Sequence, residues 1–331
     1  MRLLALIAIG LGSCVSAAWS DPCSFTPQTT ALPQLQGRVV FEDFATGQLY
    51  VYDFKTNVLT NLLVSYWGLT SATNPVFSPD GSGILFSAVV GSPPNDQRHL
   101  FYWKIGTGLP INLTGGMGNL RNEDPKFSSN GARVLWKQNN GIETADFSFD
   151  DLGRPALLHP TQVIGSSPEA SGPVFSPTQK YIYYFRSNGT VQQLWRYDSS
   201  ANPPSTAPAF SQDPSIQYYY PADPDLYDFL YVSWLPTAVA CPHCDKIYVR
   251  TRLPDAGTPW NPTDCAADNS DPAPVDEDYF IYSRDRNPDG NSSYELYLGQ
   301  LSTGSAWKLN ISIASSSLLG SNYTNVRPPT P

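Results

Sequence analysis

Alternating apolar and polar stretches predict that this chain consists of short β-strands joined by turns. From Asn74 to Val90 the sequence is NPVFSPDGSGILFSAVV: an apolar run, a Ser-Pro-Asp-Gly segment and a second apolar run. Runs of Val, Ile and Phe bounded by Pro, Asp and Gly are typical of strands that pair across a tight turn. The stretch therefore predicts a β-hairpin.

The same pattern returns at intervals of about fifty residues. Its clearest copies are DPKFSSNGARVLWK (Asp124–Lys137) and GPVFSPTQKYIYYFR (Gly172–Arg186), and weaker copies begin at Tyr220 and Asp271. Third and fourth strand-like runs follow in most copies. The second strand of each copy carries an aromatic residue at its third position: Phe41, Phe86, Trp136, Tyr184, Tyr231 and Tyr282. Six units of four strands predict an all-β fold, a six-bladed β-propeller, in which each sheet covers the apolar face of the next.

The first unit lacks its own leading strand. Either NYTNVRPP (Asn322–Pro329) or CSFTPQTTALP (Cys23–Pro33) can supply it and so join the two ends of the chain. In both cases residues 37–331 are expected to form a single domain, after an N-terminal extension over residues 18–36.

The NPVFSPDG signature resembles the WD40-like repeats of TolB-type propellers, over most of residues 37–312. The resemblance implies a six-bladed ring. It implies less about function, because such blades occur in binding proteins, peptidase propellers and lyases alike. Pro79, Asp80 and Gly81 of the signature are residues that tight turns require, and we assign them no catalytic role.

Charge and the N-terminus narrow the range of partners. The 331 residues carry a net charge of -9 and no cluster of Lys and Arg, which argues against nucleic acid as a partner. Residues 1–17 have one positive charge, an apolar stretch and small residues, as expected of a secretory signal peptide cut after Ala17. Alternatively, LGSC marks a bacterial lipoprotein with Cys14 lipidated. No other segment is apolar enough for a membrane helix, and we expect an exported monomer.

Export makes disulfides and glycans relevant. Cys23, Cys241, Cys244 and Cys265 allow three pairings, and the sequence does not choose among them. A zinc site at Cys241, His243, Cys244 and Cys265 is a poorly spaced alternative. Glycosylation sequons lie at Asn112, Asn188, Asn291, Asn310 and Asn322.

Charged residues at the ends of the aligned second strands are the candidate ligand-binding residues. In a propeller these ends share one face with the connections between blades, and that face surrounds the central channel. The predicted rim residues are Glu42, Asp43, Glu123, Lys137, Arg186 and Arg284, with Asp124 beside them. Arginine grips carboxylates with two parallel hydrogen bonds, so this set suits an anionic ligand such as a sugar acid. The alternative is that these charges pair with one another.

The loop after Arg284 has some features of a calcium site. Asp285, Asn287 and Asp289 fit the first positions of an EF-hand loop, but the closing glutamate falls one position early, at Glu295. We expect a solvated turn and no cofactor, with calcium as the alternative.

Two functions remain open. The chain has three histidines, no G-x-S-x-G motif and no hydrolase domain after the propeller. The first hypothesis is a secreted binding protein that recognises a glycan or a protein through its channel face. The alternative is a secreted carbohydrate-active enzyme, similar to a polysaccharide lyase, acting on an anionic glycan.

Overall fold

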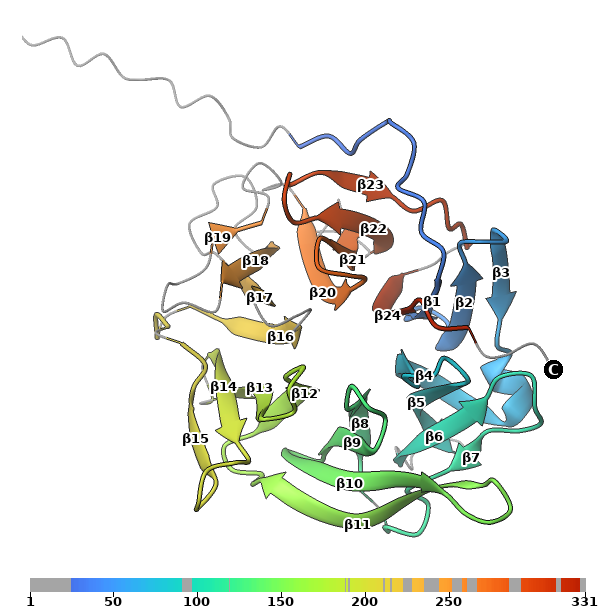
Figure 1. Ribbon diagram of the computed structural model, residues 1–331, viewed down its shortest axis with the longest axis vertical. Coiled ribbons are helices and arrows are strands. Elements are labelled where there is room, and N and C mark those ends of the chain that lie inside the picture. Colours follow the sequence, from blue (N-terminus) through green and yellow to red (C-terminus); the bar gives the residue numbers. More distant parts are fainter. Residues whose placement is uncertain are drawn as a thin grey trace, which may run out of the picture.

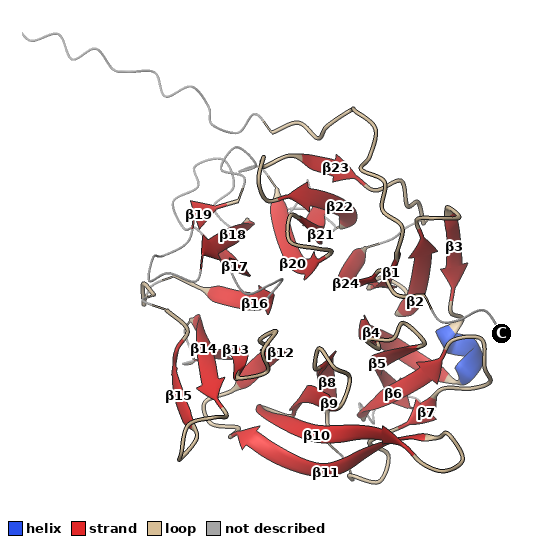
Figure 2. Ribbon diagram, viewed as in Figure 1, coloured by secondary structure: helices blue, strands red, loops and turns tan. Residues whose placement is uncertain are grey.

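The chain folds into four-stranded antiparallel sheets arranged around a common axis (Figure 1). The computed structural model describes residues 25–90, 97–118, 120–187, 189, 191–210, 212–214, 216–222, 228–234, 244–251, 258–260, 267–285, 293–313 and 317–327. For residues 228–234, 251 and 258–259 it describes the backbone alone. Within these residues the one helical segment is η1 (Val64–Trp67), after the first sheet (Figure 2). No helix of the described part is long and apolar enough to cross a membrane.

The described strands pair into six such sheets, each ordered from an innermost to an outermost strand. The first contains β24 (Leu318–Thr324), β1 (Arg38–Asp43), β2 (Gln48–Asp53) and β3 (Val58–Asn61). The second contains β4 (Leu69–Phe77), β5 (Gly83–Val90), β6 (Arg98–Lys104) and β7 (Ile111–Asn112). The third contains β8 (Asn122–Phe127), β9 (Arg133–Gln138), β10 (Gly141–Phe149) and β11 (Pro155–Ile164).

The remaining three sheets repeat this order. The fourth contains β12 (Ala170–Phe175), β13 (Tyr181–Ser187), β14 (Gln192–Asp198) and β15 (Ser205–Pro208). The fifth contains β16 (Tyr218–Ala222), β17 (Asp228–Trp234), β18 (Asp245–Thr251) and β19 (Thr258–Pro259). The sixth contains β20 (Asp268–Pro274), β21 (Tyr279–Asp285), β22 (Glu295–Gln300) and β23 (Ala306–Lys308). The expected all-β propeller of four-stranded blades is therefore confirmed.

The hydrophobic core is divided among the interfaces between neighbouring sheets. One buried cluster joins Val40 and Leu49 of the first sheet to Phe86 of the second, and each following pair of sheets has a cluster of its own. The repeated aromatic residues of the second strands lie in these interfaces, fully buried: Phe41, Phe86, Trp136, Tyr184 and Tyr282. A single four-stranded sheet cannot bury both of its faces alone. Stacking against the two neighbouring sheets buries the apolar side chains on both faces.

The C-terminal strand closes the ring. β24 pairs antiparallel with β1, with Thr324 opposite Arg38 and Leu318 opposite Asp43. Of the two closing segments left open by the sequence, the C-terminal one is therefore used, and its strand begins four residues earlier than NYTNVRPP. Residues 25–36 instead run past the outer strand of the sixth sheet, where the Gln28 N–H donates to the Ala306 carbonyl at 2.7 Å.

The Ser-Pro-Asp-Gly segment makes the turn that its sequence predicts. The Asp80 carboxylate accepts hydrogen bonds from the Ser78 hydroxyl at 2.6 Å and from the Ser82 N–H at 3.0 Å. Gly81 has a φ of +66°, a conformation that residues with a Cβ adopt reluctantly. These residues serve the fold, as expected.

Candidate functional site: the central channel

Each innermost strand contains a bulge at an equivalent position. A register shift interrupts its pairing with the second strand in all six sheets. The residues at these shifts have φ values between 47° and 57°, and we call them the bulge ring: Asn74, Asp124, Gly172, Tyr220, Asp271 and Gly320. Proline follows five of the six. Since proline has no N–H to donate, regular pairing is interrupted there, which favours a bulge.

The bulge ring lines a central channel composed of three cavities. The first, which we call the mouth, has a volume of about 420 Å³ and lies on the face where the second strands end, with Glu42, Glu123 and Lys137 in its wall. The second, the waist, has about 210 Å³ and is lined by all six bulge residues. A third cavity, of about 230 Å³, opens below the waist and shares Lys126 and Asn322 with it. Shared lining residues place the three cavities next to one another.

Three carboxylates in the channel connect neighbouring blades. Glu42 accepts a hydrogen bond from the Asn74 N–H at 2.5 Å. Asp124 accepts one from the Asn74 side-chain amide and one from the Gly172 N–H. Asp271 accepts one from the Gly320 N–H. At each of these three bulges a backbone N–H group is left without a partner in the neighbouring strand, and one of the carboxylates accepts its hydrogen bond.

Burial makes these carboxylates weak acids. Desolvation, together with the negative charges of Asp271 and Asp124, raises the pKa of Glu42 to about 8, although the hydrogen bond from Asn74 acts in the opposite direction. Desolvation likewise raises the pKa of Asp271 to about 6 and raises the pKa of Asp124. At neutral pH Glu42 therefore holds a proton that it would release in water.

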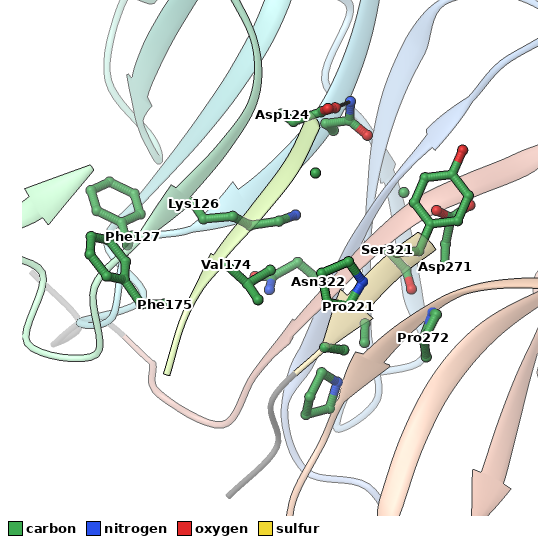
Figure 3. Close-up of a pocket in the computed structure, with 17 residues that line it drawn as sticks. Asp124, Lys126, Phe127, Val174, Phe175, Pro221, Asp271, Pro272, Ser321 and Asn322 are labelled. Atoms are coloured by element: carbon green, nitrogen blue, oxygen red, sulfur yellow. Dashed lines mark hydrogen bonds between the residues drawn. The ribbon is translucent and has the colours of Figure 1, made fainter. Parts of the chain in front are cut away.

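Lys126 and Ser321 face the carboxylates across the waist. Lys126 lies two residues after Asp124 on β8, and Figure 3 shows its side chain reaching into the cavity between Asp124 and Asp271. Desolvation lowers the pKa of Lys126, whereas the three carboxylates act in the opposite direction. Ser321, on β24, lies beside Asn322 in the same wall. The channel thus carries both signs of charge within one small volume.

The mouth is lined by ion pairs. Glu123 contacts Arg98 at 3.4 Å and Arg121 at 2.9 Å, and Lys137 contacts Glu169 at 2.8 Å. Of the predicted rim residues, Glu42, Glu123 and Lys137 meet here, together with Asp124. Glu123 and Lys137 thus form ion pairs, but their partners are not among the predicted rim residues.

The structure does not bring the other three predicted rim residues into the described cavities. Asp43 is fully buried and accepts hydrogen bonds from the Thr46 hydroxyl at 2.6 Å and the Ser317 N–H at 3.0 Å, which fix a turn and the closing segment. Arg186 stacks on Trp195 at 5.3 Å. Arg284 is buried and stacks on Phe25 at 4.9 Å. The two arginines on which the sugar-acid hypothesis depended thus pack against aromatic rings.

The bulge ring itself was not predicted. Asn74, Gly172, Tyr220 and Asp271 were treated as parts of a repeat signature, and Gly320 and Lys126 were not singled out. The signal was present in the sequence, because an X-Pro pair opens five of the leading strands. Reading X-Pro as a bulge, with X directed into the channel, would have found five of the six bulge residues, but neither Gly320 nor Lys126.

Other predicted sites lie partly outside the described residues. Asn287 and Asp289 of the calcium hypothesis lie there, and Asp285 is buried. The described residues contain no group of metal-ligating side chains. Cys244 is disulfide-bonded, whereas Cys23, Cys241 and Cys265 lie outside the described residues, so the pairing stays a prediction.

The sequons differ in their surroundings. Asn112 and Asn310 are exposed, and Asn188 and Asn291 lie outside the described residues. Asn322 lines the channel, and its side-chain oxygen accepts a hydrogen bond from the Phe77 N–H at 2.9 Å. A glycan at Asn322 would have to displace this contact and fill the waist.

Comparison with known proteins identifies the fold and no closer relationship. No family model and no curated protein matches the chain. TolB from Acinetobacter baumannii is similar in structure, with a TM-score of 0.59 and 14% identity over 88% of this chain and 67% of that one. Kuenenia stuttgartiensis hydrazine synthase gives 0.62 and 12% over 90% of this chain and 47% of that one. A chain of a nidogen/laminin complex gives 0.58 and 10% over 88% and 99%. At such identities the likeness shows a TolB-like propeller fold alone.

Proposed function

We propose that this chain is an exported, six-bladed TolB-like propeller that acts as a binding protein and receives a protruding group of its partner in the channel mouth. A TolB-like propeller fold supports a binding role. The observation that carries the proposal is the mouth, a cavity of about 420 Å³ whose wall presents charged side chains from several blades. Concave cavities of roughly 300–1,000 Å³ with a few oriented polar groups are the usual form of a binding site.

The ion pairs of the mouth support a preformed site. The carboxylate of Glu123 is held by Arg98, which also donates to the Ser71 carbonyl at 2.8 Å. Lys137 projects from β9 and pairs with Glu169 in the connection to the next sheet. Side chains held in this way lose little conformational freedom when a partner binds, so less of the binding free energy is spent on ordering them.

The expected route to the outside of the cell also supports an extracellular partner. The signal-like residues 1–17 and the sequons at Asn112 and Asn310 suit a secreted glycoprotein. In the alternative, lipidation of Cys14 holds the propeller at a bacterial membrane. Sequencing the N-terminus of the mature protein separates the two, because cleavage after Ala17 removes Cys14.

The test uses the full chain, labelled with a fluorophore, on an array of glycans and of extracellular and cell-surface proteins. We expect saturable binding to one class of printed partner, weakened at least tenfold by Lys137→Gln. The matched control is Lys180→Gln. Lys180 lies in the turn between β12 and β13, on the opposite face, and like Lys137 it forms an ion pair, with Asp198 of β14. If Lys137→Gln and Lys180→Gln weaken binding equally, the partner does not bind in the mouth.

A second arm addresses the enzyme alternative. The same preparations are incubated with polysaccharides of uronic acids, and absorbance from new unsaturated ends is followed. We expect no change. Turnover that Lys137→Gln abolishes would replace the binding function with a lyase function at the same cavity.

A further inference from the structure

The waist contains a buried polar group that has no partner among the described residues. Ser321 is 8% exposed, and its hydroxyl makes no hydrogen bond to any residue that the structure describes. Buried hydroxyls in folded proteins are nearly always paired, because leaving one unpaired costs roughly 1–3 kcal/mol. Ser321 lines the waist beside Asp271 (Figure 3), but its hydroxyl oxygen is shielded from solvent, so a ligand contacts it only after the side chain rotates to another staggered position.

Lys126 is similarly unmatched. Among the described residues its ammonium group forms no hydrogen bond and no ion pair, although it interacts electrostatically with Asp124 and Asp271 in the same cavity. The ammonium and the carboxylates are therefore separated by more than contact distance. A group that bridges the two accepts a hydrogen bond from Lys126 and donates one to a carboxylate. A hydroxyl group does both.

Apart from Asn74 and Asn322, most of the remaining wall of the waist is apolar. Val174, Pro221, Ala222, Pro272 and Ala273 surround the polar groups. The volume of about 210 Å³ is suited to one small ring and opens toward the mouth through the shared residues of the bulge ring. Tyr220, whose residue is 41% exposed, lines both cavities and offers an aromatic surface at the entrance.

We propose that the waist binds one neutral sugar residue that enters through the mouth. Its hydroxyls accept hydrogen bonds from Lys126 and Ser321 and donate to Asp124 and Asp271, and its C–H face lies against the apolar wall. The inference rests on the proposed binding function and makes the partner a glycan with a neutral end. A sugar acid is disfavoured, because its carboxylate would be placed beside the carboxylates of Asp124 and Asp271.

Calorimetric titration of the full chain with methyl glycosides of glucose, galactose, mannose and glucuronic acid tests this. We expect at least one neutral glycoside to bind, and the glucuronide to bind at least tenfold more weakly. Loss of one or two hydrogen bonds in Ser321→Ala and in Lys126→Met should weaken neutral binding by about five- to tenfold each. The exposed Ser205→Ala in β15 is the control and should bind as the wild type does.

The Ser321→Ala variant separates binding from folding. Because its hydroxyl has no partner to lose, the variant should melt at the wild-type temperature or above it. The inference is overturned if no neutral glycoside binds, if both channel variants bind as the wild type does, or if the glucuronide binds most tightly. If a protein partner binds in a way that requires Lys137 but no sugar binds, the proposed function is supported and the sugar site is contradicted.

Discussion

Arg327 and Asp53 form a two-pronged ion pair between the C-terminal segment and β2. The two guanidinium nitrogens of Arg327 donate to the two carboxylate oxygens of Asp53 at 2.6 and 2.8 Å, and one of them also donates to the Gln36 carbonyl at 2.8 Å. The residues are 274 positions apart in sequence. The pair therefore adds to the β24–β1 pairing in holding the two ends of the chain together.

Asp53→Asn should weaken this closure. We expect a loss of about 1 kcal/mol in the free energy of unfolding at neutral pH, since a partly exposed ion pair contributes little more. Hydrogen bonds from Arg327 hold the pKa of Asp53 below its usual value. The stabilisation is therefore present above the unfolded pKa and is lost as the pH falls. Urea unfolding at pH 7 and pH 3 measures both effects, and a variant equally destabilised at the two pH values would contradict the assignment.

Glu42 should make stability decrease as the pH rises. Its pKa is raised from 4.5 to about 8, so the folded state holds a proton that the unfolded chain has released. That stabilisation is complete below pH 4.5 and is lost as the pH approaches 8. Glu42→Gln keeps an oxygen for the Asn74 N–H and removes the ionisation. Between pH 5 and pH 9 it should therefore reduce the decline in stability by on the order of 4 kcal/mol, at about 1.4 kcal/mol per pKa unit.

Unfolding free energies of wild type and Glu42→Gln between pH 5 and pH 9 provide the measurement. The exposed Glu277→Gln is the matched control and should leave the profile unchanged. Parallel profiles for wild type and Glu42→Gln would show that Glu42 is ionised in the folded protein.

Gly81→Ala should destabilise the protein more than the same change at Gly106. Both glycines have positive φ values, +66° and +79°, so each substitution carries a backbone cost of about 1 kcal/mol. A Cβ at Gly81 would in addition lie 2.4 Å from the Val326 carbonyl oxygen, whereas nothing lies within 4 Å at Gly106. We expect Gly81→Ala to cost at least about 1 kcal/mol more by chemical denaturation. Equal losses would mean that the C-terminal segment moves aside freely.

Trp136→Phe should be costly because Trp136 combines burial with a hydrogen bond. The side chain is fully buried, and its Nε1 donates to the Asn122 side-chain oxygen at 3.0 Å. Loss of ring volume and of this bond should lower the free energy of unfolding by about 2 kcal/mol. Trp103→Phe is the control, because Trp103 is only partly buried and donates near the surface to Thr107. Similar losses in the two variants would contradict this ranking.

Much of the fold follows from local sequence. The hairpin of residues 74–90, the Asp80–Gly81 turn and the spacing of the buried aromatics from Phe41 to Tyr282 depend on strand and turn preferences and on burial, which a repeating pattern records directly. The sequence did not determine which segment closes the ring, because β24 and β1 lie at opposite ends of the chain and meet only in the folded protein. Local preferences carry no information about such a pairing.

The candidate site was only partly predicted, for a related reason. Glu42, Glu123 and Lys137 follow from strand direction, which brings the ends of the second strands to one face. Arg186 and Arg284 lie at equivalent ends, yet each packs on an aromatic ring, because side chains alternate between faces along a strand and neighbouring rings compete for the guanidinium.

The sequence by itself determined the repeating unit, its turns and the aromatic residues that each sheet buries, since these depend on residues close together in the chain. The tertiary structure alone decided which residues share the channel. Lys126, Asp271 and Ser321 come from three different sheets. Only closure of the ring brings them into one cavity, where desolvation and mutual charge give them properties that none has in its own segment.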